Sequence, residues 1–183
     1  TLYNRWKRWS DNGVFARIMV GLAAKDTDPR TIMTDATYLK AHRTACSLRA
    51  KGGGRGRQID RTTDAKGRPI RFFMSAGQVS DYTGAAALEH SLPQADWLLV
   101  DRGYDADWLR KALQDRGIKS CTIGRKSRKK TVTYDNRRYK RCKRIEIMSG
   151  RLKDSRRVVT RYDRCRETYL SVIALATTVL FWL

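Results

Sequence analysis

Segments of β-strand character alternate with helical segments along the 183-residue chain, and this alternation limits the possible folds more than any other feature. Residues 30–42 (RTIMTDATYLKAH) are rich in β-branched side chains and alternate in polarity, which predicts a strand with Asp35 at its middle. Residues 69–77 (PIRFFMSAG) predict another strand, and 97–100 (WLLV) a short buried strand ending at Asp101. Strands that alternate with helices predict an α/β domain in which helices cover a sheet.

The segments between and after these strands are helical in pattern. Acidic and threonine residues open a predicted helix at 81–92, and Gly117 closes another at 105–117. Residues 118–124 can form a short strand, and 139–159 again have helical periodicity. The apolar stretch at 168–183 is shorter than the roughly 20 residues of a membrane span, so it predicts a buried closing helix and no membrane partner.

Two regions of the chain lack a strand pattern. Residues 1–26 predict two short helices separated by the break DNG at 11–13. Residues 49–69 are basic and rich in glycine, which predicts a long loop between the first two strands.

The charge of the chain favours a polyanionic partner. There are 39 Lys and Arg against 18 Asp and Glu, a net charge of +21 with a sequence pI near 10.4. Residues 116–166 hold 20 basic and 4 acidic side chains, so we expect the main nucleic-acid-binding part there, with an anionic membrane as the second candidate partner. A basic RNA-binding protein without catalysis is an alternative, but the sequence has no RNP-type aromatic motif.

The cysteines do not predict a zinc or redox site. Cys46, Cys121, Cys142 and Cys165 are widely spaced, and no pair has C-x-x-C spacing. We expect free thiols in a reducing cytosol.

Three carboxylates are carried on predicted core elements: Asp35, Asp101 and Glu146. Glu146 lies on a predicted helix beside an apolar stripe, and a second stripe of that helix contains Tyr139, Cys142, Glu146 and Lys153. Carboxylate oxygens suit Mg²⁺ or Mn²⁺, and two such ions can activate a water or hydroxyl for attack on a phosphodiester. A strand aspartate can equally be the partner of an arginine, and a helix glutamate a surface ion pair. Spacing alone leaves these alternatives open.

Four blocks of the sequence resemble, in the same order, the DDE-type transposases of bacterial insertion sequences, in the IS-five-like family: TDATYLKAHR, SAGQVSDYTGAAAL, WLLVDRGYDADW and RIEIMSGRLKDSRRVVTRYDRC. The resemblance implies a ribonuclease-H-like mixed sheet flanked by helices, with Asp35, Asp101 and Glu146 as catalytic and metal-binding residues. It also implies that 1–26 are a helical remnant of an N-terminal DNA-binding region and that 27–183 form the catalytic domain.

The same resemblance implies metal-dependent DNA strand cleavage and strand transfer in transposition, with two Mg²⁺ or Mn²⁺ ions as cofactors. The implied partners are the transposon ends and target DNA, with a possible homodimer on DNA in the bacterial cytoplasm, at the nucleoid. The residues expected to contact DNA are Tyr139, Arg141, Lys143, Arg144, Arg151 and Lys153.

Two departures from the family pattern bear on activity. Cys142 stands where the family has an arginine, and a thiol cannot make the bidentate phosphate contact of a guanidinium. Between 49 and 69, only QIDRT remains where the family has its second strand, so we expect that strand to be lost or shortened. A catalytically inactive fragment that only binds DNA non-specifically is therefore an alternative.

Overall fold

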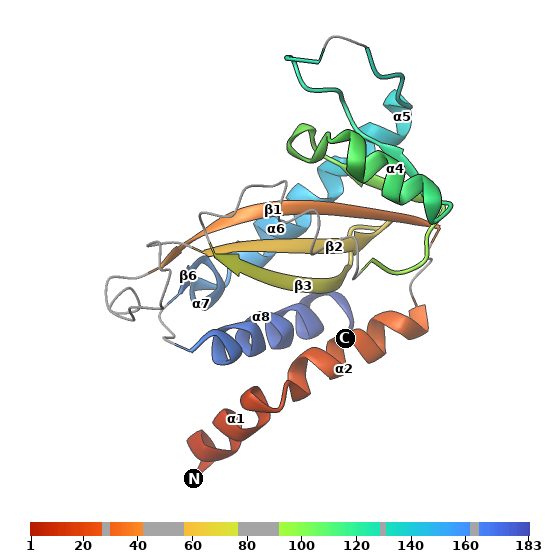
Figure 1. The fold of residues 1–183 in the computed structure, drawn as a ribbon. Coiled ribbons are helices and arrows are strands. Elements are labelled where there is room, and N and C mark those ends of the chain that lie inside the picture. The colour runs from red at the N-terminus through yellow and green to blue at the C-terminus, as the bar shows by residue number, and fades with distance from the viewer. Residues whose placement is uncertain (27–29, 42–56, 77–91, 129–130, 162–164) are drawn as a thin grey trace.

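The computed structural model describes residues 1–26, 30–41, 57–76, 92–128, 131–161 and 165–183. Their strands form one mixed sheet in the order β3-β2-β1-β4-β5, and β6 pairs with the far end of β1 (Figure 1). β1, β2 and β3 are antiparallel, whereas β4, β5 and β6 run parallel to their partners. The strand bounds are β1 Thr31–Ala41, β2 Arg57–Asp64, β3 Pro69–Ala76, β4 Trp97–Val100, β5 Lys119–Cys121 and β6 Thr160–Arg161.

Helices cover both faces of this sheet. In Figure 1, α4 lies on one side of the sheet, whereas α6 and α8 lie on the other, with α2 outside α8. The helix bounds are α1 Leu2–Asp11, α2 Val14–Asp26, η2 Arg102–Tyr104, α4 Asp107–Asp115, α5 Asn136–Tyr139, η3 Lys140–Cys142, α6 Lys143–Lys153, α7 Arg156–Val159 and α8 Arg166–Phe181.

Each face of the sheet has its own hydrophobic core because successive strand residues point to opposite sides. Met33 and Leu99 belong to the core under α6 and α8, which also contains Ile145, Met148 and Tyr169. Their neighbours along the strands face α4, in a core made of Ile32, Leu92, Ala95, Leu98, Val100, Tyr104, Leu109, Leu113 and Ile118. By the same alternation, residue 35 lies on the α6 side.

Most predicted elements are confirmed with small changes of boundary. The strands expected at 30–42, 69–77 and 97–100 are β1, β3 and β4, and α4 ends before Gly117, whose φ is +74°. The two helices predicted at the N-terminus are α1 and α2, and the predicted closing helix is α8. Among the described residues, no helix has the length and apolarity to cross a membrane. The helix expected at 81–92 lies, except for its last residue, outside the described residues.

The predicted helix at 139–159 is divided into α5, η3, α6 and α7. The chain leaves helical geometry at Ser155, where φ is −79° and ψ is 111°. This turn directs Val158 into the core, where its carbonyl accepts a hydrogen bond from the Tyr169 hydroxyl at 2.5 Å. Tertiary packing therefore breaks a helix that local periodicity would continue.

The expectation of a lost second strand is wrong, and so is the loop prediction for 57–64. β2 has eight residues and pairs with β1 from Ile32↔Asp64 to Leu39↔Arg57. Its polar run resembles a loop in the sequence, but its described charged side chains have partners in the fold. Asp60 accepts from the Tyr104 hydroxyl at 3.0 Å, Arg61 pairs with Asp35, and Asp64 pairs with Arg68. Residues 49–56 lie outside the described residues.

Candidate active site

Asp35 and Asp101 occupy neighbouring positions on parallel strands. The last paired residues of β1 and β4 are Thr34↔Val100, so Asp35 and Asp101 are one step further along the same register. Asp35 is half-buried and Asp101, where the chain leaves β4, is exposed. One carboxylate oxygen of Asp101 accepts a hydrogen bond from the Gly103 backbone N–H at 3.0 Å. The backbone carbonyl of Asp101 accepts another from Thr122 Oγ1 at 2.8 Å.

Glu146 is exposed on α6, the helix that covers this face of the sheet. It lies one turn after Cys142, whose partly buried thiol has a pKa raised to about 12. Burial is the main cause, followed by the negative charge of Cys121 and of three carboxylates, those of Asp101, Asp35 and Glu146. All three carboxylates therefore lie close enough to a single thiol to act on it electrostatically.

The chemistry of these side chains fits a divalent cation, because carboxylate oxygens are the ligands that Mg²⁺ and Mn²⁺ prefer. In this structure, however, the three carboxylates do not form a cluster that could hold a metal ion. No group of three His, Cys, Asp or Glu within the described part of the chain stands close enough together to hold a metal ion. Asp35 instead pairs with a guanidinium: Arg61 Nη2 lies 2.7 Å from Asp35 Oδ2.

Arg61 is a component of the site that the sequence analysis missed. It lies opposite Asp35 in the β1–β2 register, and its side chain is only 6% exposed. Burial lowers the pKa of Arg61, and the charge and hydrogen bond of Asp35 partly oppose this effect. The available signal was the alternation of Ile59, Arg61 and Thr63, which puts all three on one face of a strand. Assignment of this segment to a loop concealed it.

Tyr139 lies at the end of α5, near the carboxylates. Its half-buried ring contacts Tyr134 edge to face, with centroids 5.6 Å apart. Burial raises the pKa of the Tyr139 hydroxyl, and the charges of Cys142 and Asp101 add to this effect. The hydroxyl therefore stays protonated at neutral pH and can donate a hydrogen bond.

The basic residues expected to contact DNA occupy different environments along α6. Arg141, in η3, and Lys143, the first residue of α6, are exposed. Arg144 instead donates to the Ala65 carbonyl in the β2–β3 turn, and the Arg151 guanidinium lies over the Phe181 ring at 4.9 Å. Lys153 is exposed at the end of the helix and lines a small cavity with Arg61.

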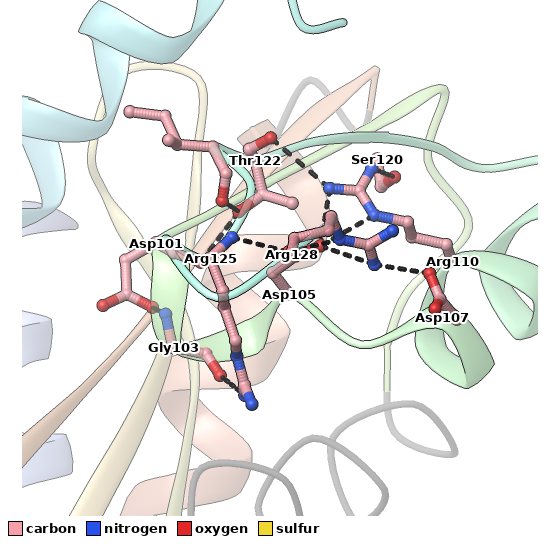
Figure 2. A network of polar contacts seen from close by, with 10 residues as sticks. Asp101, Gly103, Asp105, Asp107, Arg110, Ser120, Thr122, Arg125 and Arg128 are labelled. Atoms are coloured by element: carbon pink, nitrogen blue, oxygen red, sulfur yellow. Dashed lines mark hydrogen bonds and ion pairs between the residues drawn. The ribbon is translucent and has the colours of Figure 1, made fainter. Parts of the chain in front are cut away.

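Asp105 forms a buried polar centre beside Asp101 (Figure 2). Its carboxylate accepts from Arg110 Nε at 2.9 Å, from Arg128 Nε at 3.0 Å and from the Arg125 backbone N–H at 2.8 Å. Arg125 also donates to the Gly103 carbonyl at 2.6 Å. Asp105 thus ties the segment after β5 to the turn that carries Asp101, a link that the sequence analysis did not predict.

Several arginines of the basic segment 116–166 form contacts within the protein. Arg116 donates to the Leu92 carbonyl at 2.9 Å, and Arg138 pairs with Asp135 at 3.2 Å while lying over the Trp97 ring. Together with the Asp105 network, these contacts show that part of the positive charge is structural.

Residues 98–183 match the family model described as Transposase DDE domain. A transposase for insertion sequence element IS6501 from Brucella ovis is 28% identical over 127 residues, which cover 69% of this chain and 97% of the relative.

Two solved structures share the fold at low sequence identity. A chain of the simian T-cell lymphotropic virus intasome, in complex with a PP2A regulatory subunit, has a TM-score of 0.52 at 12% identity. The piggyBac transposase, in a synaptic complex with hairpin DNA, has a TM-score of 0.53 at 9% identity. Each match covers 84% of this chain but only 49% and 46% of the neighbours, so the chain spans about half of their length. The predicted ribonuclease-H-like mixed sheet flanked by helices is confirmed.

Proposed function

We propose that this chain is a DDE-type insertion-sequence transposase domain and that it catalyses DNA strand cleavage and strand transfer in DNA transposition. The observation that supports the proposal most is the arrangement of three carboxylates. Asp35 and Asp101 are adjacent in register, and Glu146 is on α6, the helix that covers the same face of the sheet. The assignment to the IS-five-like family remains a prediction.

In the proposed site, Asp35, Asp101 and Glu146 would hold two divalent ions, Mg²⁺ or Mn²⁺. When bound, such ions supply activation of a water or 3′-hydroxyl and stabilisation of the leaving oxygen. The protein itself would orient the carboxylates that hold these ions. The hydrogen bonds from Gly103 and Thr122 fix the chain around Asp101, and the core packing of α6 fixes the position of Glu146.

The proposed DNA contacts lie around these carboxylates. Arg141, Lys143 and Lys153 are exposed on or beside α6 and can reach phosphates, whereas Arg144 and Arg151 would first have to leave their intramolecular contacts. Tyr139 can donate to a phosphate oxygen near Asp101. Phosphate contacts of this kind position DNA without reading its sequence.

The alternative of an inactive DNA-binding fragment is not favoured. It depended on the loss of a strand beside the first aspartate and on Cys142 in place of an arginine, and the first of these does not hold because β2 is present. Transposon ends and target DNA as partners, a homodimer on DNA, and 1–26 as the remnant of a DNA-binding region remain proposals.

A plasmid-nicking assay tests the proposed chemistry without knowledge of the transposon ends. Supercoiled plasmid is incubated with the purified chain and Mn²⁺, and nicked product is measured for Asp35→Asn, Asp101→Asn and Glu146→Gln. Each change removes one carboxylate charge, so we expect nicking to fall by at least about 100-fold. Glu167→Gln, at an exposed position at the start of α8, is the matched control and should nick as the parent does. Nicking that persists in all three carboxylate variants would refute the proposal.

A further inference from the structure

Arg61 presents a buried positive charge directly to Asp35. The two residues are opposite each other in the β1–β2 register, and their side chains meet at 2.7 Å on the face that α6 covers. Only 6% of the Arg61 side chain and 25% of the Asp35 side chain are exposed. Water therefore screens this pair much less than it screens a surface ion pair.

A buried guanidinium needs a counter-charge because it stays protonated in proteins. Here Asp35 supplies one. Its charge is thereby partly balanced before any cation arrives, and a divalent ion at Asp35 has to compete with a hydrogen-bonded guanidinium.

Arg61 also has little room to withdraw. The cavity beside it, lined by Ser149, Leu152 and Lys153 of α6 among others, measures about 20 Å³. This is roughly the space that a single water molecule needs, and much less than a guanidinium requires. Lys153, on the same cavity, adds a second positive charge on that side. A metal ion bound at Asp35 would therefore experience the nearby positive charge of Arg61.

We infer that Arg61 is a built-in counter-ion of Asp35 that competes with divalent cations for this carboxylate and so sets the metal affinity of the site. The inference rests on the proposed function, because it takes Asp35 as a metal ligand. It adds a residue on β2 that controls how tightly the site binds a divalent cation.

Mn²⁺ titration, measured as water-proton relaxation enhancement, tests the inference without any measurement of activity. Arg61→Gln keeps a hydrogen-bond donor but removes the charge, so we expect the Kd for Mn²⁺ to fall by about ten-fold or more, or about 1.4 kcal/mol. Arg61→Lys keeps the charge and should stay within about three-fold of the parent. The gain of Arg61→Gln should disappear in the Asp35→Asn/Arg61→Gln double variant.

Arg68→Gln is the matched control. Arg68 forms a comparable ion pair with the buried Asp64, 2.9 Å from Nε to Oδ2, in the turn after the same strand. The Arg68→Gln change therefore also removes an arginine charge from a buried ion pair, but from one that does not face Asp35. We expect the Mn²⁺ affinity of Arg68→Gln to equal that of the parent.

Thermal unfolding with and without Mn²⁺ covers the case in which Arg61→Gln is poorly folded in EDTA. Mn²⁺ should then raise its Tm more than that of the parent, since the metal replaces the lost counter-charge. An equal Mn²⁺-induced rise in Tm, or an equal Kd, would overturn the inference.

The two failures can be told apart. If the parent and Arg61→Gln bind Mn²⁺ equally and Asp101→Asn abolishes binding, the role of Arg61 is wrong and the metal site stands. If none of the proteins binds Mn²⁺, the metal site and the role of Arg61 both fail.

Discussion

Replacement of Asp105 by asparagine should destabilise the protein far more than a typical surface substitution. The Asp105 side chain has no exposed surface, and both of its oxygens accept hydrogen bonds, one from Arg110 and Arg128 and the other from Arg128 and the Arg125 backbone (Figure 2). Asparagine has nearly the same shape but no charge. Its NH2 group would face one of the N–H groups that now donate to the Asp105 carboxylate. Two guanidinium groups would lose their shared counter-charge.

The size of the effect follows from burial and exposure. Removal of one partner from a buried ion pair costs about 3–5 kcal/mol. Arg110 and Arg128 are 22% and 21% exposed, so water can partly rehydrate them, and we expect a loss of about 2–4 kcal/mol. Because a domain typically has about 5–15 kcal/mol of stability, the variant should still fold.

Urea unfolding followed by circular dichroism measures this loss. With a slope of roughly 2 kcal/mol/M, the midpoint should fall by about 1–2 M at unchanged slope. Asp107→Asn is the matched control: it also pairs with Arg128, but its side chain is 83% exposed, and we expect no measurable shift. Equal midpoints for Asp105→Asn and Asp107→Asn would refute the argument.

The pH dependence gives a second test of the same network. Burial alone would raise the pKa of Asp105, but the hydrogen bonds from Arg125, Arg110 and Arg128 outweigh it, and the pKa lies below its ordinary value. A carboxylate with a lowered folded-state pKa stabilises the protein fully above the unfolded-state pKa of about 3.9, and the stabilisation is lost as the pH falls through the folded-state value. The stability gap between the parent and Asp105→Asn should therefore be constant from about pH 7 to 5 and close below about pH 4.

Two further predictions concern the surface and the thiols. DNA affinity should fall steeply with salt, and the Arg141→Gln/Lys143→Gln double variant should lower the slope of log K against log salt by about 2, because each phosphate contact contributes about 0.9. Fluorescence anisotropy over a salt series measures this slope, and Arg116→Gln, whose guanidinium binds the Leu92 carbonyl, should leave it nearly unchanged; equal slopes for all three proteins would contradict the assignment. Cys142, with a pKa raised to about 12, should react with iodoacetamide at pH 8 about a thousand-fold more slowly than an ordinary thiol. Mass spectrometry of native against guanidinium-unfolded protein measures this difference, and labelling of Cys142 at the same rate in both would disprove it.

Local pattern was sufficient for the elements that bury apolar side chains. The alternation in 30–42 and the apolar run at 97–100 gave strands that pair as β1 and β4, because burial of one or both faces leaves a periodic trace in the sequence. The strands that carry Asp35 and Asp101 were therefore predictable, whereas the β1–β4 pairing that makes these two carboxylates neighbours is a tertiary contact.

The sequence by itself determined the sheet-forming segments that bury apolar side chains, the charge and three candidate carboxylates, all of which can be read from the local sequence. Only the tertiary structure decided that 57–64 is a strand, that Arg61 holds Asp35, and that Asp105 anchors the turn beside Asp101. The physical reason is that a buried charge is stable only beside its partner. Asp35 and Arg61 are 26 residues apart, and Asp60 and Tyr104 are 44 apart, so folding has to bring each pair together.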